Sequence, residues 1–89
     1  MYYSYVLLCE SKFRKIAYYI GSCKDLKNRV NEHIYRETKT TKKFDTITLV
    51  YYEACLNKTD ALKREKQLKT GFGRGYLNRR IHEYLKSRA

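Results

Sequence analysis

Arg29 and His33 stand four residues apart in a segment whose apolar residues recur at helical spacing, so their side chains project side by side. An arginine beside a hydrophobic seam can hold a phosphate through two parallel hydrogen bonds. Arg29 could instead form a salt bridge with Glu32 or Asp25. A lone histidine is more often a structural hydrogen-bonding group than a proton-transfer group, so both interpretations of His33 stay open.

Glu65 falls on the apolar face predicted for a second helix, three or four residues from Ala61, Leu62 and Leu68. An unpaired carboxylate is costly in such a place, so we expect a cation, a metal ion or an edge position open to solvent beside it. The alternative is a glutamate whose stem packs at the edge of the face while its carboxylate stays in water.

Tyr5 and Tyr19 are two of ten tyrosines, in a chain with three phenylalanines and no tryptophan. They fall on two strands that a short loop connects, and antiparallel pairing could bring their rings together. A tyrosine has a pKa near 10, so it acts as a general base only where nearby positive charge lowers that pKa. Each ring taken singly is an ordinary core residue.

Three strands are predicted from aromatic and β-branched runs, at residues 2–9, 15–22 and 46–55. The first two form an antiparallel hairpin, and Gly21 marks a place where the chain turns tightly or admits a close neighbour.

Three helices complete the prediction. Ser22 and Asp25 form an S-x-x-D pattern that can cap a helix running to about Glu37, with Leu26, Val30 and Ile34 as its buried stripe. Asn57 or Thr59 can cap a second helix through about Lys69. The glycine-rich segment 70–75 ends that helix, and a third, amphipathic helix follows. The order β-β-α-β-α-α predicts one α+β domain over residues 1–89, with a small three-stranded antiparallel sheet flanked by helices.

The charge of the chain favours a nucleic-acid partner. Twenty Lys and Arg against nine Asp and Glu give a formal net charge of +11, which repels itself unless a polyanion is close by. A membrane surface is disfavoured because no strongly apolar helix face accompanies the charge. Candidate nucleic-acid contacts are Lys24, Lys27, Lys42, Lys43, Arg74 and Arg79.

Cys9, Cys23 and Cys55 are odd in number and lack CxxC spacing, so we expect reduced thiols rather than a disulfide framework or a zinc site. No segment has the roughly 18 apolar residues of a membrane span, and no secretory signal begins the chain. These features predict a cytoplasmic protein.

The ordered set of these residues resembles the GIY-YIG nuclease superfamily. The second signature motif is present as Tyr19-Ile20-Gly21, Arg29 stands eight residues after Gly21, His33 follows, and Glu65 lies within the segment ALKREKQLK. The first motif reads Tyr3-Ser4-Tyr5, which keeps the functional tyrosine but not the Gly-Ile before it. Asn78 lies roughly where family members carry a further polar site residue. The chain looks most like the small stand-alone bacterial members, which are similar to the N-terminal nuclease module of the excision-repair endonuclease.

The resemblance implies hydrolysis of DNA phosphodiester bonds by activated water, with Tyr5, Tyr19, Arg29, His33 and Glu65 in the site. One divalent ion, Mg²⁺ or Mn²⁺, would be held by Glu65, while Arg29 stabilises the developing charge. Either tyrosine could take the proton. The alternatives are a nucleic-acid-binding module on the same scaffold that has lost cleavage, and a protein-interaction domain with a basic surface.

Overall fold

The computed structural model describes residues 1–13, 15–35 and 44–88. Its elements are β1 (Tyr2–Glu10), β2 (Ile16–Cys23), α1 (Leu26–Ile34), β3 (Thr46–Cys55), α3 (Lys58–Leu68), α4 (Gly71–Arg80) and α5 (His82–Ser87). The predicted α+β class and element order are confirmed, with the last predicted helix divided into α4 and the short α5.

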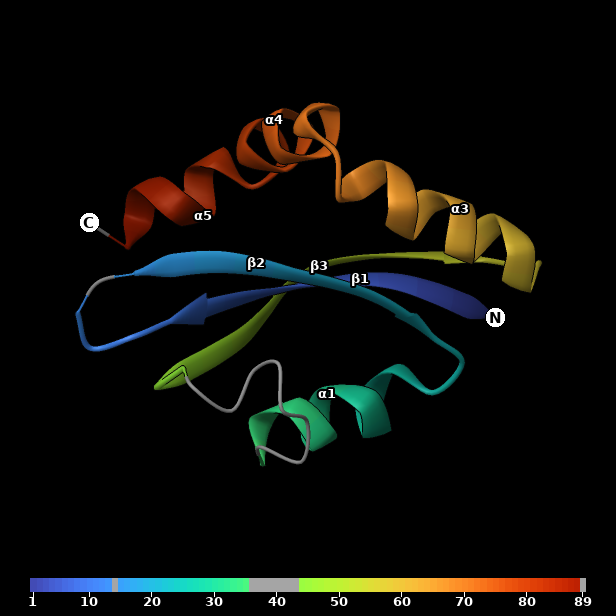
Figure 1. Cartoon of the computed structure of the whole chain (residues 1–89), viewed down its shortest axis with the longest axis horizontal. Coiled ribbons are helices and arrows are strands. Elements are labelled where there is room, and N and C mark those ends of the chain that lie inside the picture. Colours follow the sequence, from blue (N-terminus) through green and yellow to red (C-terminus); the bar gives the residue numbers. More distant parts are fainter. Residues whose placement is uncertain (14, 36–43, 89) are drawn as a thin grey trace.

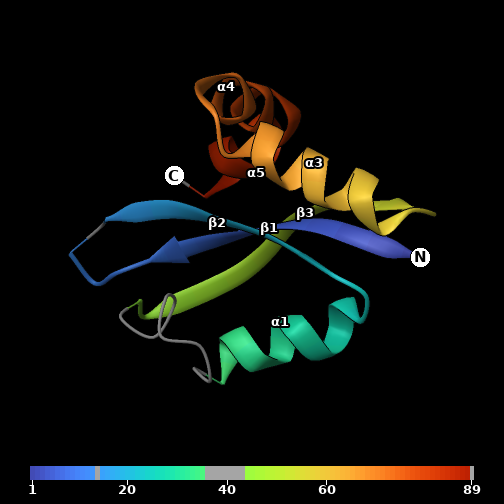
Figure 2. The same ribbon diagram turned by 45° about the vertical axis from the view of Figure 1, so that its right-hand side comes forward.

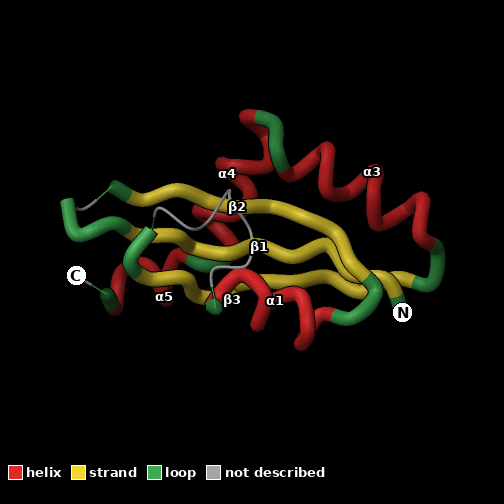
Figure 3. The backbone as a smooth tube through the Cα atoms, turned by 60° about the horizontal axis from the view of Figure 1, so that its bottom comes forward, coloured by secondary structure: helices red, strands yellow, loops and turns green. Residues whose placement is uncertain are grey.

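The three strands form one antiparallel sheet in the order β2-β1-β3. Figures 1 and 2 show the sheet as a middle layer, with α1 against one face and α3, α4 and α5 against the other. Figure 3 shows β1 in the centre, so that β2 and β3 are the two edge strands.

The central strand β1 is an unbroken apolar run because both of its faces are covered. Tyr5, Leu7 and Cys9 pack on the α1 side, in a cluster with Leu26 and Val30. The alternating residue Val6 packs on the opposite side with Ile20, Leu68 and Leu77. The two small cores are therefore separated by the sheet, and a residue of β1 or β2 belongs to one face or the other according to strand alternation.

The start of α1 differs from the sequence prediction. Asp25 caps the helix by accepting a hydrogen bond from the Asn28 amide at 3.1 Å, whereas Ser22 still lies within β2. The cap therefore begins three residues later than predicted. The described helix ends at Ile34 with Tyr35 as its C-cap, and the predicted end at Glu37 lies outside the described residues.

The buried stripe of α1 was predicted wrongly at its last member. Ile34 is 44% exposed, and His33 is fully buried instead. The sheet-facing residues are thus Leu26, Arg29, Val30 and His33, which follow the i, i+3, i+4, i+7 spacing of a helix face. The polar residues Arg29 and His33 belong to this sheet-facing side of α1 because the Tyr5 hydroxyl on β1 offers them a hydrogen-bond partner.

The glycine-rich segment 70–75 follows the end of α3, as predicted, but the next helix begins within this segment rather than after it. Thr70 caps α4 by accepting from the Gly73 amide, and Gly71, Gly73 and Gly75 all lie within the helix. A Cβ on Gly73 would stand 2.1 Å from the Leu68 carbonyl oxygen, so glycine is what lets α4 pack against the end of α3. Asn57 caps α3 as predicted.

The three cysteines are free thiols, as expected. Within residues 1–13, 15–35 and 44–88, no helix has the length and apolar character needed to cross a membrane.

Candidate active site

Tyr5 is the centre of a polar cluster on the α1 face of the sheet. Its side chain is fully buried, and its hydroxyl lies 3.1 Å from His33 Nε2. The Tyr5 ring lies 6.3 Å from the Tyr19 ring, as pairing of the two strands predicts. The Tyr19 ring in turn lies 4.7 Å from the His33 ring. Strands β1 and β2 and helix α1 therefore bring Tyr5, Tyr19 and His33 into contact.

Gly21 makes room for the Tyr5 ring. The two residues are direct partners across β2 and β1, and a Cβ on Gly21 would stand 2.5 Å from the Tyr5 hydroxyl and 2.7 Å from Cζ. Of the two roles predicted for Gly21, the structure supports close approach, because β2 continues without a turn to Cys23.

Arg29 adds a positive charge to this cluster. Hydrogen bonding to the Tyr5 hydroxyl, opposed by burial, raises the pKa of Arg29. Glu32, one of the two salt-bridge partners considered from the sequence, approaches Nη1 at 3.4 Å, and the Arg29 side chain remains 40% exposed. Arg29 Nε is buried and has no hydrogen-bond partner within the described part of the chain. Because Nε is buried, a ligand could approach only the exposed part of the Arg29 side chain.

The protonation states in the cluster follow from burial. Burial raises the pKa of Tyr5 to about 12, although hydrogen bonding from Arg29 opposes the rise. Burial and the charge of Arg29 lower the pKa of His33, so the imidazole is neutral at pH 7. Because Arg29 can only donate, the Tyr5 oxygen accepts from it, and the tautomer of His33 decides which group donates in the 3.1 Å contact between Tyr5 and His33 Nε2. The Tyr5 hydroxyl thus links Arg29 to His33 through hydrogen bonds.

Glu65 lies on the other face of the sheet. Its carboxylate accepts a hydrogen bond from Lys69 Nζ at 2.7 Å, and its side chain is 19% exposed. Burial opposes ionisation, but hydrogen bonding from Lys69 and Ser22 and the charge of Lys66 lower the pKa of Glu65 overall. Glu65 was predicted on the inward-facing side of its helix, and its hydrogen bond with Ser22 of β2 confirms that it faces the sheet. The predicted burial of Leu62 is wrong, because Leu62 is 41% exposed on the outer side of α3.

A cavity of about 210 Å³ lies between β2 and the junction of α3 with α4. Its lining includes Tyr19 from the α1-face cluster and Lys69, the partner of Glu65. Arg74, near the start of α4, lines it as well. Arg29, His33 and Glu65 are not among its lining residues.

The other residues singled out from the sequence are spread over the surface. Lys24 and Lys27 are exposed beside α1, and Arg74 and Arg79 are exposed on α4, across the sheet. Lys42 and Lys43 lie outside the described residues. Asn78 accepts a hydrogen bond from the Tyr18 hydroxyl at 2.8 Å, which ties α4 to β2 next to the cavity.

A second polar network was not predicted from the sequence. Arg64 donates to both carboxylate oxygens of Glu53 at 2.9–3.0 Å, and its guanidinium lies 4.9 Å from the Tyr76 ring centre. Tyr51 donates to Glu53 at 2.9 Å and lies 2.7 Å from the Tyr76 hydroxyl. The position of Arg64 could have indicated this network, because Arg64 falls on the same helix face as Ala61, Glu65 and Leu68 and so needs a partner on the sheet. This network anchors α3, and with it Glu65, over the sheet.

No three or more His, Cys, Asp or Glu side chains gather to hold a metal ion within the described ranges. A metal site here would therefore depend on a single carboxylate, with phosphate and water oxygens as the other ligands, which is an arrangement that Mg²⁺ accepts.

A family model described as the GIY-YIG catalytic domain matches residues 1–80. The match spans most of the 89-residue chain and contains Tyr5, Tyr19, Arg29, His33 and Glu65. No curated protein and no solved structure matches the chain.

Proposed function

The chain belongs to the GIY-YIG family, and from this membership we propose that it is a metal-dependent endonuclease that hydrolyses phosphodiester bonds in DNA. GIY-YIG catalytic domains have nuclease-type activity and act on nucleic acid. The observation that carries the finer proposal is Arg29, whose guanidinium is held beside Tyr5 while part of its side chain stays open to solvent.

Arg29 would bind the phosphate that is cleaved. Its side chain is 40% exposed, so a phosphate oxygen can approach it. Its weak contact with Glu32 at 3.4 Å can be exchanged for a phosphate without unpairing a buried acid. The hydrogen bond to Tyr5 fixes the guanidinium before the substrate arrives, which is the preorganisation that stabilises charge in a transition state.

Tyr19 is the tyrosine that would meet the attacking water. It lines the cavity at the β2 edge, whereas Tyr5 is fully buried and is hydrogen-bonded with His33. The pKa of Tyr5, raised to about 12, also makes it a poor proton acceptor near neutral pH. We therefore assign Tyr19 to orienting water or accepting its proton, and Tyr5 and His33 to holding Arg29 and Tyr19 in place.

Glu65 would hold the divalent ion. Its lowered pKa keeps the carboxylate ionised. The side chain of its partner Lys69 is 53% exposed, so Lys69 can move away when a cation binds to Glu65. A bound Mg²⁺ or Mn²⁺ would stabilise the charge on the phosphate and lower the pKa of a coordinated water. The surface position of Lys69 also disfavours the alternative that Glu65 is the structural partner of a buried cation.

Cleavage assays on the pure protein test this proposal. Labelled single-stranded, duplex and branched DNA would be incubated with and without Mg²⁺ or Mn²⁺. We expect metal-dependent cleavage by the wild type, none by Glu65→Gln, and retained DNA binding in both. The matched control is Glu83→Gln, which removes a carboxylate that is 81% exposed on α5.

Thermal melts separate loss of activity from loss of fold. Glu65 and Lys69 form a surface pair, so Glu65→Gln should change the unfolding free energy by less than about 1 kcal/mol. An active Glu65→Gln variant would refute the proposed metal site. DNA binding without cleavage under any metal condition would instead identify the chain as an inactive binding module.

A further inference from the structure

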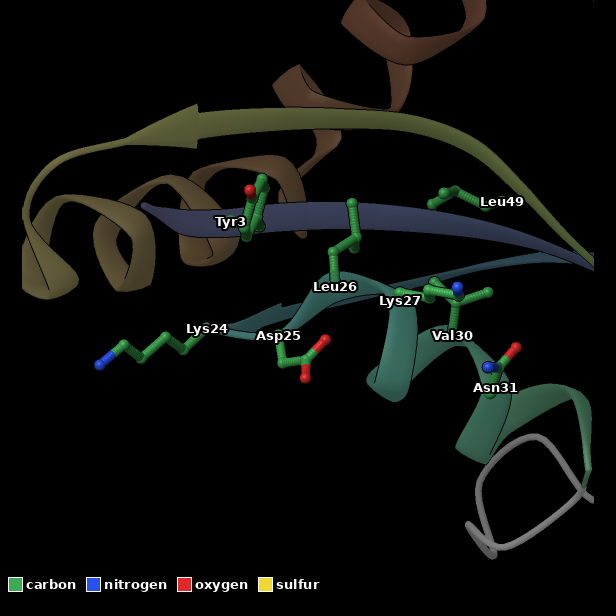
Figure 4. Close-up of a pocket in the computed structure, with 8 residues that line it drawn as sticks. All are labelled: Tyr3, Lys24, Asp25, Leu26, Lys27, Val30, Asn31 and Leu49. Carbon is green, nitrogen blue, oxygen red and sulfur yellow. The ribbon is translucent and has the colours of Figure 1, made fainter.

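A groove of about 910 Å³ lies between α1 and the sheet, on the side of α1 that faces β3. Figure 4 shows Tyr3 and Leu49 along the sheet, with Leu26 and Val30 pointing from α1 toward them. Lys24, Asp25, Lys27 and Asn31 form the rest of its lining. The groove thus has an apolar floor and a polar rim, and its volume is in the range of sites for small organic ligands.

An aromatic pair lies at the sheet side of this groove. Tyr3 packs edge to face on Tyr52, with ring centres 5.9 Å apart. Tyr52 is 52% exposed, which leaves much of an aromatic ring open to solvent next to the groove. Aromatic rings of this kind bind unpaired bases by stacking, and every base has a face that can stack.

The rim of the groove carries net positive charge. Lys24 and Lys27 are both exposed, and Figure 4 shows Lys24 extending outward from the end of β2. The one acid in the lining, Asp25, accepts a hydrogen bond from the Asn28 amide as the cap of α1. Its charge is therefore directed at the helix terminus, and the lysines are left to attract an anion.

The groove lies beside the candidate active site on the same face of the sheet. Tyr3 and Tyr5 are two residues apart on β1, about 7 Å along the strand, which is the rise of about two stacked nucleotides. Leu26 and Val30 line the groove and also belong to the cluster around Tyr5. Arg29 lies between them in sequence on α1. Its side chain turns toward Tyr5 rather than toward the groove, so a DNA strand bound at Arg29 would have to pass over α1 to enter the groove.

We infer that this groove binds one or two unpaired nucleotides of the DNA substrate. The bases stack on Tyr3 and Tyr52, and a phosphate contacts Lys27, whereas the Lys24 ammonium lies 5.9 Å from the Tyr2 ring centre. The inference rests on the proposed nuclease function for its choice of ligand. It implies that the substrate has a single-stranded segment.

Binding of a fluorescein-labelled (dT)8 oligonucleotide, measured by anisotropy in EDTA, tests the groove without any cleavage. Tyr3→Leu and Tyr52→Leu should each weaken binding by about 5- to 150-fold, the range for losing one stacked base. Tyr84→Leu, which removes a tyrosine 40% exposed on α5, should bind like the wild type.

The salt dependence distinguishes stacking from phosphate contact. Lys27→Ala should lower the slope of log K against log salt by about 0.7, the value for one phosphate on a single strand, whereas the tyrosine variants should keep the wild-type slope. Lys63→Ala, an exposed lysine on α3, is the matched control. In the wild type, (dT)8 carrying 5-iododeoxyuridine should crosslink to Tyr3 or Tyr52, which needs no variant to fold.

Wild-type affinity in both tyrosine variants, or crosslinks only to other residues, would overturn the inference. So would a wild-type dimer in solution that Tyr3→Leu dissociates, because the groove would then hold a second copy of the chain. Cleavage of DNA by the wild type is scored separately. A protein that cleaves but fails the (dT)8 tests refutes the groove alone, and one that passes them but never cleaves refutes the nuclease proposal alone.

Discussion

Replacing Gly21 by alanine adds a single methyl group at the point where two strands meet the candidate site. The new Cβ would stand 2.5 Å from the Tyr5 hydroxyl, and ordinary contacts begin at 3.4 Å. The hydroxyl must therefore move by about 0.9 Å, although the ring is fully buried. Such a shift would stretch the 3.1 Å contact with His33 beyond hydrogen-bond length.

Two costs contribute to the expected loss of stability. Overpacking a well-packed core costs about 1–3 kcal/mol, and losing the Tyr5–His33 hydrogen bond costs about 0.5–1.5 kcal/mol. Gly21→Ala should therefore destabilise the fold by about 1.5–4.5 kcal/mol. For a chain of this size the midpoint of thermal unfolding should fall by at least about 6 °C.

Urea unfolding and thermal melts of four variants, Gly21→Ala, Tyr5→Leu, their combination and a control, would measure this effect. The matched control is Gly71→Ala, because a Cβ on Gly71 meets nothing within 4 Å, and we expect it to be neutral or slightly stabilising. Gly21→Ala combined with Tyr5→Leu should be less destabilised than the sum of the single variants, by about 1 kcal/mol or more. A Gly21→Ala protein with wild-type stability and activity would show that the Tyr5 ring does not need this space.

Three further perturbations test other parts of the site. Arg29→Ala should reduce cleavage by about 10²–10³-fold, while losing the hydrogen bond to Tyr5 should cost only about 0.5–1.5 kcal/mol of unfolding free energy. Arg29→Lys should restore little activity, since lysine lacks the planar fork, and full activity of either variant would remove Arg29 from the site. His33 has a lowered pKa in the folded protein, so the unfolded chain binds a proton at this residue more readily than the folded chain does. The contribution of His33 to the unfolding free energy should therefore be constant above about pH 6.5 and fall below that pH, by at most about 1.4 kcal/mol per pH unit. His33→Gln should remove this component and His82→Gln should not, as urea titrations at several pH values would show. Arg64→Ala should lower the unfolding free energy by about 1–2 kcal/mol, because it breaks the partly exposed pair with Glu53. It should also reduce cleavage, because α3 carries Glu65 and would shift. If Arg64→Ala were as active as the control Lys63→Ala, the Arg64 network would not support the site.

Much of the fold could be predicted because strands and caps depend on local sequence. The run 46–55 matches β3 residue for residue, and Asn57 caps α3 as its type and position predict. Segment 70–75 was correctly predicted to end α3 but was not predicted to begin α4, because glycine is a poor helix former. Their helical conformation depends on a tertiary contact, the close approach of Gly73 to the Leu68 carbonyl group, which local propensity cannot indicate.

The candidate site was harder to predict where its residues depend on a partner across the sheet. Ile34 seemed a better core residue than His33 by hydrophobicity alone. The structure reverses them because the buried Tyr5 hydroxyl needs a hydrogen-bond partner at that place. In the same way Arg64 pairs with Glu53, eleven residues earlier and on another element, so neither residue taken alone predicts the network.

The edge position of β2 explains how a site can use side chains that the sheet otherwise keeps apart. Strand alternation sends Tyr18 to the α4 side, where it bonds Asn78, and sends Tyr19 to the α1 side, where it contacts His33. In a central strand these two faces would stay separated, as they are along β1. In the proposed site, a phosphate at this edge would contact Arg29 on the α1 side and a metal ion held by Glu65, the partner of Ser22, on the α3 side. Tyr19 and Ser22 of β2 would then serve the two halves of that site, and Gly21 between them leaves room for the Tyr5 ring.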